Sequence, residues 1–421
     1  MKYFLIGING ISMQGIAEYL RQQGHIVVGS DIKTGGHKKE NITGDIDLVV
    51  RTSAVTPGSP GWIEVEEANR RNIKVVKRSE FIGILFKDKK MIAVSGMHGK
   101  TTVTSMVSLV LTGAGFDPTC LVGDVVTEWG DVLRVGHSPW FVFEACEYDK
   151  NILFYRPYIL VLTNIEEEHL DSYPGGLPEI METFSQYIDR VPSDGLIIAC
   201  RKDANIKALL AKTQSQAPVI YYGGDEGDYS KLDFPLSIPG HHNVENALAV
   251  VALADHLKIE RKITEDCLQK FKGAHRRFER MGQYNGSDII DDYGHHPTEI
   301  RATIEGLVER YPEKRKVVVF WPHQYKRILP LLAEFGDCFA GIDELILKPI
   351  FFVSGRDEEL PVRSEDIMKL TEANGIKTSV MTTDEEIVTY LEKIIDKDSV
   401  LLTLGIPPVY KIGEILAKEN I

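Results

Sequence analysis

The sequence predicts an α/β fold in which three domains are each built on a parallel sheet. Short runs of apolar and β-branched residues alternate with helical patterns along the whole 421-residue chain. This alternation is typical of doubly wound parallel sheets. A chain of this length also exceeds what one compact core usually accommodates, which favours two or three domains.

The expected strands fall into three sets. The first set is Tyr3–Ile8, His25–Ser30, Asp47–Ser53 and Ile73–Lys77, with helices expected over 14–23 and 63–71. The second set is Met91–Ser95, Trp140–Glu144, Ile159–Thr163 and Leu196–Cys200. The third set is Asp288–Ile290, Lys316–Trp321, Glu344–Leu347 and Ser399–Thr403. A charged bridge at 87–90 precedes the second set and the stretch 271–280 precedes the third, which predicts domains over 1–88, 89–274 and 275–421.

Composition and charge exclude several classes of function. Lys and Arg number 48 against 61 Asp and Glu, so the net charge is −13 and broad binding to nucleic acid or anionic membranes is not expected. The five cysteines are scattered and form no C-x-x-C, which argues against disulfides and zinc and favours a reducing cytoplasm. No signal-peptide pattern and no apolar run near the ~18 residues of a membrane span is present.

A glycine-containing loop follows the first expected strand. Gly7 and Gly10 lie in the turn, Gly15 lies near the helix start, and Asp31 ends the second strand. Glycines let backbone N–H groups approach a diphosphate at a helix N-terminus, and an acid about twenty residues on can hold a ribose hydroxyl. The spacing G-x-x-G-x-x-x-x-G differs from G-x-G-x-x-G. The loop is therefore interpreted as a site for a UDP-sugar diphosphate or for NAD, or as a tight turn without a ligand.

A second loop follows the buried strand Met91–Ser95. It reads Gly-Met-His-Gly-Lys-Thr-Thr over 96–102, and a helix is expected from about Val103 to Thr112. Backbone N–H groups of such a loop can cradle a triphosphate, with Lys100 on the β- and γ-oxygens and the Thr101 hydroxyl on Mg²⁺. The usual phosphate loop has a glycine where Val94 stands, so a chance Gly-Lys-Thr turn is the alternative interpretation.

Five motifs spread along the chain resemble those of the ATP-dependent Mur ligases and occur in the same order as in that family. The loop 96–102 is similar to the family's G-T-H-G-K-T-T, with Met97 for Thr, and 7–18 resembles its UDP-binding G-I-G-G-I-G-M-S-G-I-A-E. Residues 239–247 resemble P-G-x-H-N-x-x-N-A, 276–279 match R-R-F-E, and 291–299 match D-D-Y-G-H-H-P-T-E residue for residue. The resemblance covers essentially the whole chain and is strongest to the members that attach L-alanine to UDP-N-acetylmuramate.

The resemblance implies a fold and an activity. The fold would be a Rossmann-like domain that binds the UDP-sugar, a central P-loop ATPase domain with a parallel sheet, and a C-terminal Rossmann-like domain that closes over ATP and binds the amino acid. ATP would phosphorylate the carboxylate of UDP-N-acetylmuramate, and the amine of an amino acid, L-alanine by expectation, would displace the phosphate. The enzyme would serve peptidoglycan precursor synthesis in the cytoplasm, with ATP and Mg²⁺, as a monomer or weak homodimer.

The resemblance also implies roles for individual residues. ATP would contact Gly96, His98, Gly99, Lys100, Thr101, Thr102, Asn246, Arg277 and Asp292. Mg²⁺ would be held by Thr101, Glu144 and His169, the UDP-sugar by Gly7, Asn9, Gly10, Ile11, Asp31 and Ser53, and the amino acid by His295, Gln324 and Arg327. Lys100, Glu144, His169 and Arg327 would be catalytic, because both chemical steps gather negative charge that cations and N–H donors stabilise.

Several of these residues also have a structural interpretation. His169 and His295 could be packing histidines, and Asn246 could be an amide on a helix surface. Arg277 and Asp292 could form a salt bridge between domains. The acidic run 166–168 is interpreted as a solvated face without a role.

Departures from the family pattern cluster where substrates are expected. Cys146 and Tyr148 differ from the family's E-A-D-E-S-D, Gln324 replaces one of two arginines, 405–408 read G-I-P-P instead of G-A-G-D, and Asn9 replaces a glycine. These changes leave open a related ligase that attaches a preformed peptide or uses a modified precursor. The stretch 323–325 favours the alanine enzymes. A non-catalytic nucleotide-binding regulator is disfavoured because the residues at the phosphate loop are intact, and an NAD-dependent oxidoreductase would leave that loop unexplained.

Overall fold

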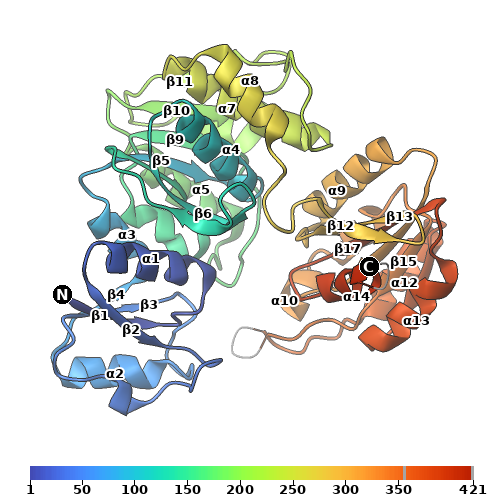
Figure 1. The fold of residues 1–421 in the computed structure, drawn as a ribbon, viewed down its shortest axis with the longest axis horizontal. Coiled ribbons are helices and arrows are strands. Elements are labelled where there is room, and N and C mark those ends of the chain that lie inside the picture. The colour runs from blue at the N-terminus through green and yellow to red at the C-terminus, as the bar shows by residue number, and fades with distance from the viewer. Residues whose placement is uncertain (354–356, 419–421) are drawn as a thin grey trace. The chain divides into compact units, whose positions relative to one another are not determined.

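The computed structural model describes residues 1–353 and 357–418 and divides them into two compact units (Figure 1). The first unit comprises 1–237 and 244–271, and the second comprises 238–243 and the chain from Lys272 onwards. Each unit is built from strands and helices that alternate along the chain, so the predicted α/β class is confirmed. Among the described residues, none of the helices combines the length and the apolar character that crossing a membrane requires.

The N-terminal part of the first unit is a four-stranded parallel sheet in the order β2-β1-β3-β4. Its strands are β1 (Lys2–Ile6), β2 (Ile26–Ser30), β3 (Leu48–Arg51) and β4 (Val75–Lys77), and its helices are α1 (Ile11–Gln22), α2 (Trp62–Arg70) and α3 (Arg78–Leu85), with the short helix η1 (Lys39–Asn41). Phe4 and Val49 of the central strands pack with Val65 of α2 in a buried cluster. All four expected strands are therefore present.

The central sheet has seven strands in the order β11-β10-β9-β5-β8-β6-β7. They are β5 (Lys90–Ser95), β6 (Thr119–Val126), β7 (Asp131–Arg134), β8 (Trp140–Glu144), β9 (Ile159–Leu162), β10 (Leu196–Cys200) and β11 (Val219–Tyr222). The helices are α4 (Lys100–Gly113), η2 (Tyr148–Phe154), α5 (Gly176–Ile188), α6 (Ala204–Leu210), α7 (His241–His256) and α8 (Arg261–Lys270). Only the β6–β7 pair is antiparallel.

Helix α1 packs against the β6–β7 hairpin, and this contact explains one glycine of the first loop. A Cβ atom on Gly15 would lie 2.8 Å from Leu121 Cδ1. Real Cβ atoms do not approach this closely, so the glycine allows the helix and the hairpin to pack. Gly15 therefore has a packing role between α1 and the hairpin, and its place in a ligand-binding turn stays a prediction.

The second unit contains a six-stranded sheet in the order β12-β13-β17-β14-β15-β16. Its strands are β12 (Glu279–Tyr284), β13 (Ser287–Asp292), β14 (Arg315–Phe320), β15 (Glu344–Leu347), β16 (Lys377–Val380) and β17 (Ser399–Leu404). Its helices are α9 (Pro297–Arg310), α10 (Tyr325–Ile328), α11 (Leu332–Asp337), α12 (Ser364–Ala373), α13 (Asp384–Ile394) and α14 (Tyr410–Lys418). One buried cluster includes Ile300, Phe335 and Ile367, and a second includes Ile387 and Ile412, so helices cover both faces of the sheet.

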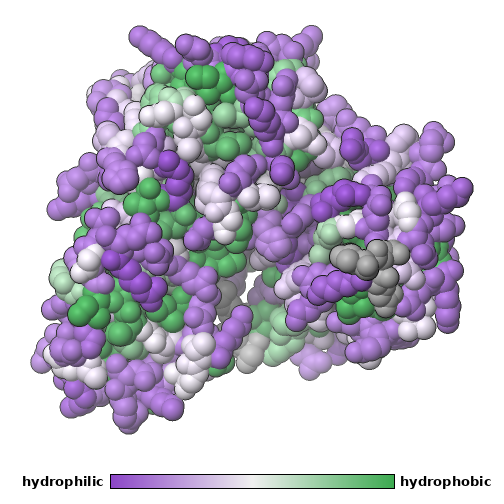
Figure 2. All heavy atoms as spheres, viewed as in Figure 1, coloured by the Kyte–Doolittle hydropathy of each residue, from purple (hydrophilic) through white to green (hydrophobic). Residues whose placement is uncertain are grey.

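The surface agrees with the acidic, charge-rich composition. On the face drawn in Figure 2, hydrophilic side chains project outermost in both units, and apolar side chains lie between and beneath them. Most charged side chains are exposed or partly exposed, and a few, such as Lys100 and Glu147, are buried.

Candidate nucleotide-binding site

The phosphate loop lies at the carboxyl end of β5, the strand between β8 and β9. Gly96 and Gly99 have φ angles of 140° and 79°, in the region that favours glycine. A Cβ atom on Gly96 would lie 2.1 Å from Thr163 Oγ1, and one on Gly99 would lie 2.7 Å from Asn246 Oδ1. Both positions therefore require glycine for conformation and for space.

Helix α4 begins at Lys100, not near Val103 as the sequence predicted. The lysine and both threonines of the loop form its first turn, whose backbone N–H groups lack partners within the helix. The positive end of the helix dipole therefore points toward the loop, an arrangement that attracts phosphate.

The end of β9 holds the loop in place. Asn164 Oδ1 accepts hydrogen bonds from the N–H groups of Met97 and His98, at 3.0 and 2.8 Å. Thr163 Oγ1 donates to the carbonyl of His98 at 2.6 Å. Thr163 ends an expected strand, and the sequence assigned neither residue a function. Their role became visible only when β9 was placed beside β5.

Lys100 lies in a buried cluster with Glu147 and His169. Its Nζ is 3.0 Å from Glu147 Oε2, and His169 Nε2 is 3.2 Å from Glu147 Oε1. Burial alone would raise the pKa of Glu147, but the Lys100 charge and the His169 hydrogen bond hold that pKa below its usual value. Burial would lower the pKa of His169, and the carboxylates of Glu147 and Glu168 raise it above its usual value.

Thr101 and Glu144 meet on another side of the loop. Thr101 Oγ1 donates to Glu144 Oε2 at 2.7 Å. A Cβ atom on Gly123 of β6 would lie 2.2 Å from the same oxygen, so this glycine makes room for the carboxylate. A hydroxyl and a carboxylate in contact are hard oxygen donors of the kind that Mg²⁺ prefers.

The structure brings Glu144, Lys100 and His169 to one sheet edge. Strand β5 lies between β8, which ends at Glu144, and β9, which precedes His169. The carboxyl ends of the three parallel strands converge. His169 reaches Lys100 through Glu147.

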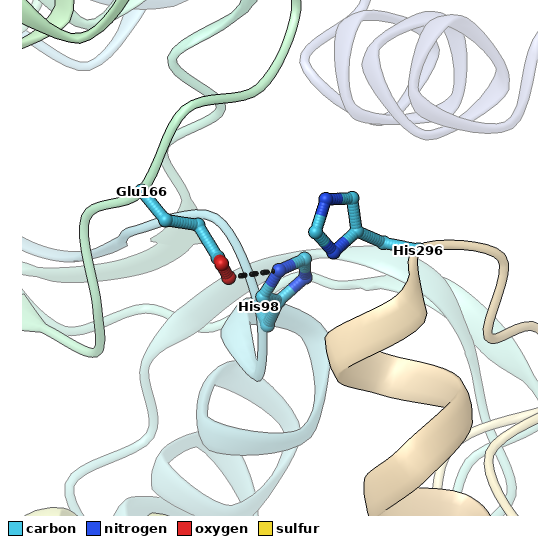
Figure 3. A group of neighbouring side chains, drawn as sticks. All are labelled: His98, Glu166 and His296. Carbon is cyan, nitrogen blue, oxygen red and sulfur yellow. Dashed lines mark ion pairs between the residues drawn. The ribbon is translucent and has the colours of Figure 1, made fainter. Parts of the chain in front are cut away.

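The acidic run 166–168 is not a solvated face. Glu166 forms an ion pair with Nε2 of His98 in the phosphate loop (Figure 3). Glu168 is buried, and its carboxylate lies 3.9 Å from His169 Nε2. Asn246 of α7 is also buried, with its amide against Gly99, so it is not a helix-surface amide.

The N-terminal loop is held mainly by backbone hydrogen bonds, two of them to the end of β2. The N–H groups of Gly7 and Ile8 both donate to the carbonyl of Ser30, at 2.8 and 3.1 Å, and Gly10 N–H donates to Gly7 O. Asn9 N–H donates to the Asp31 carboxylate at 3.3 Å. Asp31 thus lies beside the loop, as the sequence predicted, and its contact with a ribose stays a prediction.

Two further residues expected at the UDP-sugar lie outside the turn itself, at the start of α1 and after β3. Ile11 is the exposed first residue of α1. Ser53 follows β3, and its Oγ accepts a hydrogen bond from Asn151 of η2 at 3.3 Å. Ser53 therefore joins the first sheet to the central one.

In the second unit, Asp292 is held at the end of β13. Its carboxylate accepts hydrogen bonds from the N–H groups of Gly294 and Phe278, at 2.7 and 2.8 Å, and from Thr303 Oγ1 at 3.1 Å. The guanidinium of Arg277 lies 5.2 Å from the centre of the Tyr293 ring. Their contacts with ATP stay predictions.

The residues expected at the amino acid lie near the ends of β13 and β14. His295 Nδ1 is 3.1 Å from the carbonyl of Tyr293, and Arg327 Nη1 is 3.1 Å from His323 Nδ1. Gln324 has a φ of 67°, and its N–H donates to Phe351 O at 3.0 Å. Such a conformation is strained for a non-glycine residue, and strain of this kind concentrates at functional sites.

Arg276, the first arginine of the R-R-F-E motif, organises the second unit. Its Nε donates to the Asp291 carboxylate at 2.7 Å, and its other nitrogens donate to the carbonyls of Gly405 and Ile406 at 2.6 and 3.0 Å. The guanidinium also lies between the rings of Tyr293 and Tyr410. No function was predicted for this arginine, although its carbonyl partners lie in the G-I-P-P stretch.

A glycine-rich loop between a parallel strand and a helix, with a buried lysine and a threonine–carboxylate contact beside it, defines a nucleotide-binding α/β enzyme of the phosphate-loop class. Comparison with known families is more specific. Residues 2–90 match the model of the Mur ligase family catalytic domain, 94–232 match the Mur ligase middle domain, and 276–405 match the Mur ligase glutamate ligase domain. The chain belongs to the Mur ligase family and is an ATP-dependent amide ligase.

Individual relatives cover the chain almost completely. It is 38% identical to the UDP-N-acetylmuramate–L-alanine ligase of Clostridium acetobutylicum, over 99% of this chain and 98% of that protein. It is 36% identical to the ligase of the same name from Caldanaerobacter subterraneus, over 99% and 97%. Among solved structures, the UDP-N-acetylmuramate-alanine ligase MurC of Thermotoga maritima superposes with a TM-score of 0.82 at 25% identity, covering 100% of this chain and 99% of that one. The murein peptide ligase of Psychrobacter arcticus shares the fold, with a TM-score of 0.72 at 23% identity over 100% and 99%.

Proposed function

We propose that the chain joins the carboxylate of UDP-N-acetylmuramate to the amino group of L-alanine, with ATP hydrolysed to ADP and phosphate. The observation that carries this proposal is the full-length identity of 36–38% to ligases of that name. A carboxylate oxygen bonds to the γ-phosphorus as ADP leaves. The amine nitrogen then bonds to the carbonyl carbon and gives up one proton, which leaves to solvent, and phosphate departs with the electron pair of the carbon–oxygen bond.

Each of the three sheet-containing regions has its own proposed role. Residues 1–88 bind the UDP-sugar, 89–274 bind ATP, and 275–421 close over ATP and bind the amino acid. Lys100 neutralises charge that gathers on the transferred phosphoryl group, and buried cations of this kind are worth most where water is excluded. Mg²⁺, held by Thr101, Glu144 and His169, would supply further charge neutralisation when bound. Five free cysteines fit a reducing cytoplasm.

A phosphate-release assay with a panel of UDP-sugars and amino acids tests this proposal. Phosphate is expected only when ATP, UDP-N-acetylmuramate and L-alanine are all present, with ADP as the nucleotide product. AMP and pyrophosphate as products would contradict the acyl-phosphate route.

A second candidate acceptor is a preformed peptide, favoured by Gln324 in place of an arginine. Faster release with a tripeptide than with L-alanine would select it.

Replacing His169 with alanine is expected to raise the Mg²⁺ concentration for half-maximal rate by roughly tenfold or more, as for disturbed metal sites generally. The reason is the loss of one nitrogen ligand and of the partner of Glu147. The measurement is the initial rate against Mg²⁺ at saturating ATP. His137→Ala, at an exposed histidine paired with Asp117, is the control. An unchanged Mg²⁺ dependence of the His169 variant would exclude the metal role.

Replacing Gln324 with arginine is expected to lower the KM for L-alanine about tenfold and to leave the KM for ATP unchanged. A hydrogen bond to a charged group contributes ~1.5–3 kcal/mol, and ~1.4 kcal/mol is tenfold in affinity. Glutamine offers the carboxylate one such bond, whereas arginine offers two parallel bonds and a positive charge. Both side chains meet the same backbone cost at a φ of 67°, so the substitution adds no new strain. Equal KM values for L-alanine in both proteins would show that Gln324 lies outside the pocket.

A further inference from the structure

Glu147 is a buried carboxylate to which neither the family resemblance nor the comparisons assign a function. It lies three residues beyond the end of β8 and directly before η2. Its side chain has no exposed surface, and its two oxygens face two different basic side chains, Lys100 and His169. Oε2 is 3.0 Å from Lys100 Nζ, and Oε1 is 3.2 Å from His169 Nε2.

The protein itself surrounds the Lys100 ammonium group with three oxygens. Its Nζ donates hydrogen bonds to the carbonyls of Gly96 and Met97, at 2.5 and 2.9 Å, and forms an ion pair with Glu147 Oε2 at 3.0 Å. An ammonium group has three N–H donors. A phosphate oxygen that approaches this lysine therefore competes with Glu147 for its charge and its remaining N–H.

Glu147 is the acceptor whose replacement is chemically favoured. The two carbonyls belong to the phosphate loop, and displacing them would require the loop itself to change. Glu147 carries a charge, and a phosphate beside Lys100 would repel it. Glu147 would keep its contact with His169 through its other oxygen after the exchange. Glu144 is not the exchanged group, because its carboxylate accepts from Thr101.

We propose that Glu147 is a positioning residue that stands in for the nucleotide phosphate, keeping Lys100 buried and oriented while the loop holds no nucleotide, and that it gives up Lys100 to a phosphate oxygen on binding. This inference rests on the proposed nucleotide site at 96–102. An isolated buried ammonium group is costly, so the empty site requires an anion at this position. The arrangement keeps the loop preformed at the expense of some nucleotide affinity.

The proposal predicts opposite changes in two properties of the Glu147→Gln variant. The melting temperature of the nucleotide-free protein should fall, because Lys100 loses its charged partner. The Kd of a non-hydrolysable ATP analogue with Mg²⁺ should fall about tenfold, because the competing anion is gone. Calorimetric titration and thermal melting, both without carboxylate and amine substrates, measure these two quantities.

A matched control separates the local effect from the change in net charge. Glu226→Gln removes the same charge from a side chain that is 81% exposed and paired with Arg201. The Glu226→Gln variant should have the wild-type Kd for the ATP analogue and the wild-type melting temperature. A merely structural role for Glu147 would weaken both folding and nucleotide binding, so equal or weaker binding by Glu147→Gln overturns the proposal.

A second variant keeps the test decisive if the glutamine variant folds poorly. Glu147→Asp keeps the negative charge but moves it one methylene farther from Lys100. The Kd of the ATP analogue should therefore lie between the wild-type value and the lower value expected for Glu147→Gln. A Kd at or above the wild-type value overturns the proposal. If the wild type does not bind the ATP analogue, both the proposed nucleotide site at 96–102 and the inference about Glu147 are wrong. If the wild type binds and both variants bind no more tightly, the inference alone is wrong.

Discussion

Replacing Lys100 with alanine is expected to slow ligation by at least about two orders of magnitude, the effect of removing one preorganised donor from a buried transition-state site. The lysine is the charged group of the phosphate loop, and its Nζ already lies against the loop carbonyls of Gly96 and Met97. Its loss leaves the charge on the transferred phosphoryl group without its nearest cation. The measurement is kcat for phosphate release at saturating substrates.

Two controls accompany this variant. Lys262→Ala removes an exposed lysine that pairs with Asp266 on α8, and it should leave kcat unchanged. Because Lys100→Ala also leaves buried Glu147 with His169 alone, the melting temperature must be measured beside the rate. A folded Lys100→Ala protein that turns over at the wild-type rate would refute the assignment of the phosphate loop.

Replacing Arg276 with alanine is expected to lower the free energy of unfolding of the second unit by about 3–5 kcal/mol, the cost of removing one partner of a buried ion pair. The Arg276 and Asp291 side chains are only 7% and 1% exposed. The substitution also frees the carbonyls of Gly405 and Ile406 from their donors. Urea unfolding, followed by a probe in the second unit, measures the loss.

Arg280→Ala is the matched control in the same unit. This arginine pairs with Asp288 but is 55% exposed, so its removal should cost about 1 kcal/mol or less. Equal losses for the two variants would contradict the buried ion pair as the source of the stability.

The loss in Arg276→Ala should also depend on pH. Burial raises the pKa of Asp291 to about 6 even though Arg276 lowers it. Without the arginine this folded-state pKa rises further above that of the unfolded chain. A raised carboxyl pKa favours the folded state at low pH, and that advantage is lost as the pH rises through the folded-state pKa. The stability difference from the wild type should therefore be larger at pH 8 than at pH 5.

The sequence by itself determined the class of fold and most of its buried strands. β8, β10 and β15 have the bounds that the sequence predicted. Strands in the interior of a parallel sheet are covered on both faces, so they read as continuous apolar runs. The loop at 96–102 was recognisable for a related reason: its glycines and lysine are adjacent in the chain, so their chemistry is visible before folding.

Several strands at or beside a sheet edge were not determined in this way. β7, β12 and β16 are edge strands with mixed or polar sequences, β11 is a four-residue edge strand, and β6 lies beside the edge strand β7. The β6–β7 and β12–β13 pairs also contain irregular registers. An edge strand is paired on one side only and partly faces solvent, so its apolar pattern is weak. The start of α4 at Lys100 was missed because glycine and threonine have low helix propensity, which the cradle of the loop overrides.

Only the tertiary structure decided which polar side chains meet at the loop. Glu147 follows β8, His169 follows β9 and Lys100 follows β5, and the sheet order β9-β5-β8 brings the three together. Asn164 and Asn246 reach the same loop from other distant parts of the chain. Local patterns report whether a strand is buried, but they carry no information about its neighbours. Strand order depends on how the whole sheet minimises exposed apolar surface, and the residues paired across it are therefore set by the complete fold.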